Sequence, residues 1–103
     1  MKKIIALSFM FLSFSSNTFA ELKAFVGTVA VLEATYMPDA ISFQMNVGDD
    51  ACPANSWMTY NKNPSNNKIV YATLLAATVS GKSVQYWHDG TNCNGSFIYI
   101  LPR

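Results

Sequence analysis

His88 is the only histidine of the chain, and Asp89 follows it directly. An imidazole beside a carboxylate can act as a general base, but successive strand side chains point to opposite faces, so adjacency alone makes no dyad. No motif typical of a nucleophile surrounds any serine. Asp49 and Asp50 lack the ligand spacing of a calcium loop, which favours a solvated turn. We therefore expect no enzymatic activity, no cofactor and no metal site.

Cys52 and Cys93 are the only two cysteines of the chain. In an oxidising compartment they would pair with each other, since two cysteines allow a single intramolecular bridge. Closing a loop of about 40 residues stabilises the fold by roughly 4 kcal/mol in the chain-entropy model. A reactive or metal-binding thiol would need a nearby cationic or His/Cys cluster, which the sequence does not supply. The sequence therefore predicts a Cys52–Cys93 disulfide.

Amphipathic aromatic residues near strand ends are the best candidates for ligand contact. Aromatic rings suit the apolar faces of sugars, and Asn and Asp side chains suit their hydroxyl groups. The candidate ligand-binding residues are Tyr60, Trp87, His88, Asp89 and Asn92. The alternative for such aromatic residues is to fill the core, and for Trp57 both roles remain open. Tyr86 and Trp87 are adjacent in an expected strand, so one of them faces outward.

The first twenty residues have the layout of a secretory signal. Lys2 and Lys3 precede an apolar run over residues 4–12, and small residues end at Ala20. The run is about ten residues long, half of what a membrane span needs. We expect residues 1–20 to be removed and residues 21–103 to form a single secreted or periplasmic domain. Removing the two lysines changes the net charge from +1 to −1, which does not favour binding to nucleic acid.

The remaining residues predict a mainly β domain with one helix. Strands are expected at residues 22–35 with a bulge at Gly27, at 41–47, 56–60, 83–88 and 96–101. A helix is expected at residues 68–80, capped by Ser65 or Asn66 and ended by Gly81. Its apolar positions are so numerous that we expect it to be buried on more than one side, by the core and by a neighbour. They include Ile69, Ala72, Leu75, Ala76 and Val79.

The order β-β-β-α-β-β is that of an OB-like five-stranded barrel. In that barrel the third and fifth strands are parallel neighbours and start at the same end. Cys52 precedes the third expected strand, and Cys93 precedes the fifth. The disulfide predicted from export is therefore compatible with the fold predicted from the element order.

Trp57, residues 72–77 (ATLLAA) and residues 80–87 (SGKSVQYW) resemble the helix–glycine–strand half of one toxin family. These are the binding subunits of subtilase-cytotoxin-type pentameric bacterial toxins and related small secreted bacterial proteins. The resemblance implies an OB-type barrel, homopentamers, glycan recognition and no catalysis. Val26 stands where that family has a serine that contacts sialic acid, and His88 stands where it has a tyrosine.

Together these patterns predict a secreted, non-enzymatic binding module for a glycan or a surface partner, forming a homo-oligomer through the apolar helix. The alternative is a small secreted or periplasmic inhibitor or accessory protein that binds another protein through the loops around Cys52 and Cys93.

Overall fold

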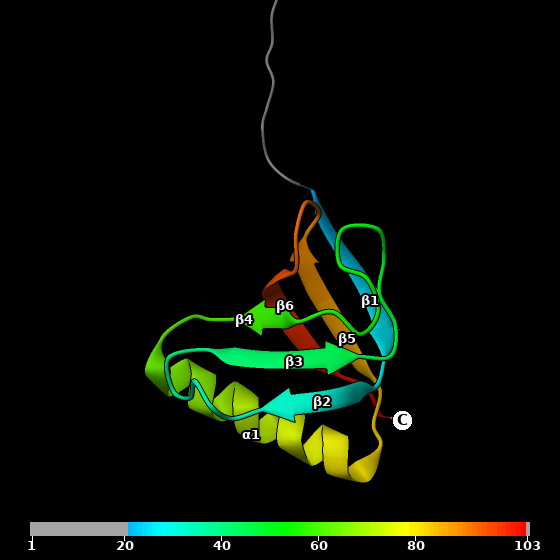
Figure 1. The fold of residues 1–103 in the computed structure, drawn as a ribbon. Coiled ribbons are helices and arrows are strands. Elements are labelled where there is room, and N and C mark those ends of the chain that lie inside the picture. The colour runs from blue at the N-terminus through cyan, green and yellow to red at the C-terminus, as the bar shows by residue number, and fades with distance from the viewer. Residues whose placement is uncertain (1–20, 103) are drawn as a thin grey trace, which may run out of the picture.

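The computed structural model describes residues 21–102, so the predicted signal segment, residues 1–20, lies outside the described part. The described chain is mainly β, with one helix (Figure 1). Its elements are β1 (Leu22–Gly27), β2 (Val29–Glu33), β3 (Ile41–Met45), β4 (Met58–Tyr60), α1 (Pro64–Ser80), β5 (Val84–Asp89) and β6 (Asn94–Ile100). Over residues 21–102, no helix is both long enough and apolar enough to cross a membrane.

The strands form one mixed sheet in the order β1-β5-β6-β4-β3-β2. Only β4 and β6 are parallel to each other, and the other neighbouring strands are antiparallel. The parallel pair is the one that the sequence predicted between the third and fifth strands. In the described residues β1 and β2 are the two edges of the sheet and do not pair, so the sheet is not closed and the five-stranded barrel is not confirmed.

The single strand expected over residues 22–35 is two strands, separated at Thr28. The backbone N–H of Thr28 donates to Asn46 Oδ1 at 2.8 Å, and Asn46 N–H donates to the Thr28 carbonyl at 3.0 Å. A Cβ atom added to Gly27 would collide with the Val47 side chain. The close approach of residues 46 and 47 therefore redirects the chain here, so that β1 pairs with β5 while β2 pairs with β3.

The core lies between the inner face of the sheet and α1. In β3 the alternation of apolar and polar residues buries Ile41, Phe43 and Met45. In β5 the same alternation buries Val84, Tyr86 and His88. Leu74 and Ala77 of α1 complete this core. The period-two pattern predicted from the sequence thus places these strands with one face inward.

Helix α1 begins four residues earlier than the sequence predicted. Asn63, rather than Ser65 or Asn66, is the N-cap: its side chain accepts a hydrogen bond from the Asn66 N–H, and Pro64 opens the first turn. The predicted end is confirmed, because Gly81 adopts a left-handed φ of 72° and donates its N–H to the Ala77 carbonyl.

The core buries α1 on one side only, and burial of a second side by a neighbour stays a prediction. Asn67, Leu74 and Ala77 are its buried residues, whereas the stripe that contains Ile69 and Val79 faces solvent. Because apolar residues surround most of this helix, its periodicity could not select the inner face. The helix lies alongside β2 (Figure 1), and only one of its sides packs on the sheet.

Candidate functional site

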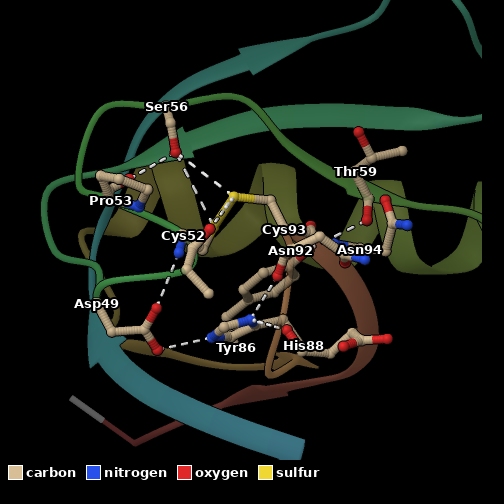
Figure 2. The surroundings of a disulfide bond; sticks show 12 residues. Asp49, Cys52, Pro53, Ser56, Thr59, Tyr86, His88, Asn92, Cys93 and Asn94 are labelled. Atoms are coloured by element: carbon tan, nitrogen blue, oxygen red, sulfur yellow. Dashed lines mark hydrogen bonds and ion pairs between the residues drawn. A yellow bond between two sulfur atoms is a disulfide. The ribbon is translucent and has the colours of Figure 1, made fainter. Parts of the chain in front are cut away.

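The predicted disulfide between Cys52 and Cys93 is present (Figure 2). It joins the loop that follows β3 to the turn between β5 and β6, with 4.9 Å between the two Cα atoms. The Tyr86 hydroxyl donates to the Cys93 carbonyl at 2.6 Å, and the Thr59 N–H donates to the same carbonyl at 3.2 Å. The bridge is therefore tied both to the core and to β4.

His88 lies under this bridge and is fully buried. Its Nε2 is 2.7 Å from Asp49 Oδ2, and its Nδ1 is 2.6 Å from the Asp89 carbonyl and 2.8 Å from the Asn92 carbonyl (Figure 2). All of these partners are acceptors, so both ring nitrogens must donate. With Asp49 ionised, the geometry therefore favours a doubly protonated, positively charged imidazole.

The charges of His88 and Asp49 support each other. Burial disfavours the His88 cation, but the hydrogen bonds to Asp49 and to the Asn92 and Asp89 carbonyls together outweigh it, so the pKa of His88 is raised above its usual 6.5. Partial desolvation opposes ionisation of Asp49, but the His88 hydrogen bond and the Cys52 N–H, at 2.9 Å, hold its pKa below 3.8. The His88–Asp49 pair therefore links the loop that contains Cys52 to the end of β5.

Tyr60, His88 and Asn92, three of the five predicted ligand-binding residues, contribute to internal structure. Tyr60 is 6% exposed and donates its hydroxyl to Asn66 Oδ1 at 2.8 Å. Asn92 accepts from His88 through its carbonyl and from the Asn94 N–H through its side chain, at 2.8 Å. The side chains of Tyr60 and His88 are thus enclosed, and Asn92 shapes the β5–β6 turn.

Trp87 and Asp89, the other two, lie on the outer face of the sheet. Pairs in an antiparallel ladder share a face, so the register builds this surface in rows across β1, β5 and β6. One row is Val26, Gln85 and Tyr99, the next is Ala24, Trp87 and Phe97, and the last is Leu22 and Asp89. We call these residues the aromatic face.

The aromatic face combines three exposed or half-exposed rings with two polar side chains. Phe97 and Tyr99 are each 49% exposed, and the ring centroids of Trp87 and Tyr99 are 6.3 Å apart. Asp89 accepts from the Thr91 N–H at 2.9 Å and hydroxyl at 2.7 Å, and these bonds lower the pKa of its carboxyl group. The sequence did not single out Phe97 and Tyr99. The alternation within the strand expected at residues 96–101 was the signal that pairs them on one face.

The Trp87 indole has a donor without a partner. Its Nε1 is shielded from solvent and has no hydrogen-bond acceptor among residues 21–102. The described residues enclose no pocket, and they contain no group of three His, Cys, Asp or Glu side chains arranged for a metal ion. The aromatic face is therefore a surface rather than a cleft.

In comparisons with known proteins, no family model, curated protein or solved structure matches this chain.

Proposed function

We propose that this protein is a secreted, non-enzymatic module that binds carbohydrate on its aromatic face. One observation carries the proposal: the pairing of β5 with β6 brings the rings of Trp87, Phe97 and Tyr99 together on the outer face of the sheet. Sugar rings present apolar C–H faces that pack on aromatic rings. Such packing needs a platform rather than a deep pocket.

The polar residues of the aromatic face are suited to sugar hydroxyls. Gln85 lies between Val26 and Tyr99 in one row, and Asp89 lies beside Leu22 in another. An amide both donates and accepts hydrogen bonds, and an ionised carboxylate accepts them. The hydrogen bonds from Thr91 fix the Asp89 carboxylate in place, which reduces the ordering that ligand binding would require.

The strand connectivity supports the finer proposal of an OB-type fold related to toxin binding subunits. If β1 and β2 are taken as two halves of one bent strand, the order becomes five strands with the helix after the third. The third and fifth strands are then the parallel pair. On this reading Val26, which replaces the family's ligand-binding serine, lies on the aromatic face next to Gln85.

A second candidate is the capture of a protein rather than a sugar. The absence of a pocket among the described residues and the apolar row Ala24–Trp87–Phe97 suit a flat protein surface. On this proposal an inhibitor or accessory protein would use the aromatic face instead of the loops around Cys52 and Cys93, so the two functions are distinguished by the ligand.

The test is a glycan array of neutral and sialylated oligosaccharides, followed by fluorescence titration of each hit. We expect Phe97→Ala and Tyr99→Ala to weaken binding at least tenfold, because each removes an exposed ring from the platform. Tyr36→Ala is the matched control, since Tyr36 is also an exposed aromatic residue but lies between β2 and β3. No glycan ligand, or equal loss in the control, would contradict carbohydrate binding.

A further inference from the structure

The solvent-facing side of α1 is apolar along its length. Ile69 is 67% exposed and Val79 is 81% exposed, and Ala72 and Ala76 between them also face solvent. Lys68 is the only charged residue of the helix. A helix with one side on a sheet normally carries polar residues on the other side. This side of α1 therefore has the apolar composition of a protein–protein interface, and it is separate from the aromatic face.

The hydroxyl groups on this side are already bonded within the helix. The Thr73 Oγ1–H donates to the Ile69 carbonyl at 2.9 Å, and the Ser80 Oγ–H donates to the Ala76 carbonyl at 2.7 Å. Each hydroxyl proton is thus used by the helix's own backbone. Covering this side would leave neither donor without an acceptor, so its desolvation is inexpensive.

We infer that this side of α1 pairs, antiparallel, with the same side of α1 from a second copy of the chain. A two-fold contact must be complementary to itself. About a centre at position 74, Ile69 meets Val79 of the other copy, and Ala72 meets its Ala76. Small side chains therefore lie at the middle, where the helices come closest, and larger ones lie at both ends.

The charges also favour this arrangement. The last turn of α1 has no basic residue and its first turn has no acidic residue, so neither helix end is neutralised by its own side chains. The C-terminus of a helix attracts cations. Antiparallel pairing brings Lys68 of each copy to Ser80 at the C-terminal end of the other, whereas parallel pairing would bring the two Lys68 side chains together.

The size of the contact predicts a weak dimer. A 17-residue helix is about 25 Å long, and one helix per copy places the interface at the small end of specific interfaces. We expect dissociation in the micromolar range, so the dimer should be seen only above that concentration.

The first experiment measures mass by light scattering after size exclusion over a concentration series of the purified protein. We expect twice the monomer mass at high concentration. Val79→Lys should give a monomer at every concentration, because it buries a charge against Ile69. Tyr36→Lys, an equivalent change at another exposed residue, should leave the dimer intact. Circular dichroism establishes that each variant is folded.

The second experiment tests the direction of pairing by mixing charged variants. Ile69→Glu and Val79→Lys should each be monomeric alone and form a heterodimer when mixed, because antiparallel packing places the two new charges opposite each other. A mixture of Ile69→Glu with Ile69→Lys should remain monomeric. The inference is overturned by a wild-type monomer at all concentrations, by a pentamer, or by rescue in the second mixture alone. It is independent of carbohydrate binding, which Val79→Lys should leave unchanged.

Discussion

At the scale of single residues, His88 has the most consequences for the fold. Three acceptors surround its two ring nitrogens: Asp49 on one side, and the carbonyls of Asp89 and Asn92 on the other. A neutral imidazole could donate to only one side and would turn a lone pair towards an acceptor on the other. The stability of the loops around the disulfide should therefore depend on the protonation of one side chain.

The pH dependence of unfolding follows from the directions of the two pKa shifts. The folded pKa of His88 is above 6.5, so its stabilisation is complete below 6.5 and is lost as the pH rises through the folded value. The folded pKa of Asp49 is below 3.8, so its stabilisation is complete above 3.8 and is lost as the pH falls through the folded value. The midpoint of urea unfolding, measured from pH 3 to pH 9, should therefore be highest between the ordinary pKa of aspartate, 3.8, and that of histidine, 6.5.

His88→Gln should be less stable than the wild type by about 2–3 kcal/mol near neutral pH, since acceptors in a buried site lose a charged donor. Its urea midpoint should no longer fall on the alkaline side. Asp50→Asn is the control, because Asp50 adjoins Asp49 but is exposed. Parallel profiles for the wild type and His88→Gln would show that another group controls the alkaline limb.

The sequence predicted only in part which candidate side chains face outward, because this depends on how the strands pair. Strand alternation indicated that one of Tyr86 and Trp87 faces outward, and the structure has Trp87 on the outer face and Tyr86 in the core. Which of the two is outside depends on the partner strands and on what covers the sheet, and neither is encoded locally. The burial of His88 and Tyr60 depends on the distant residues Asp49 and Asn66 for the same reason.

At the scale of elements, Asn67 determines how α1 is seated. It is fully buried: its Oδ1 accepts from Lys62 N–H, and the two hydrogens of its Nδ2 are shared among three acceptors, which are Asn61 Oδ1 and the carbonyls of Pro38 and Asp39. These bonds connect the first turn of the helix to the segment before it and to the turn before β3. A buried amide with this many bonds fixes the rotation of the helix about its axis.

Asn67→Ala should therefore destabilise the protein by about 3 kcal/mol, because it leaves backbone groups unpaired in a buried site. Chemical denaturation monitored by circular dichroism measures this change. Ser65→Ala, an exposed change in the same turn, should cost less than about 0.5 kcal/mol. Equal effects of the two substitutions would mean that Asn67 does not anchor the helix.

The elements themselves were largely predictable, and their faces were not. The alternation in β3 and the glycine after α1 were sufficient local signals. The division at Thr28 arises from Asn46 and Val47, which are far away in sequence. The exposed side of α1 arises from Asn67, a polar residue that no hydrophobic pattern would place inside.

At the scale of the molecule, the disulfide joins two segments that are separated by 41 residues, and β4, α1 and β5 lie between them. Replacing both Cys52 and Cys93 by alanine should lower the free energy of unfolding by about 4 kcal/mol in the chain-entropy model. For a domain of this size that lowers the melting temperature by roughly 15–30 °C. Calorimetry with and without reductant provides a second measurement on the unmodified chain. An unchanged melting temperature would mean that the bridge adds nothing to the surrounding hydrogen bonds.

The position of β1 and β2 at opposite edges of the sheet affects the order in which the protein can assemble. The partner of β2 is β3, which follows a few residues later in the sequence. The partner of β1 is β5, which begins only at Val84. A chain emerging from its N-terminus therefore carries an unpaired strand until almost all of it has been made. Pairings between distant segments form slowly, and strands that wait for them are exposed to aggregation. The pairing of β1 therefore depends on about the last fifth of the sequence, and chains that stop before β5 leave β1 unpaired.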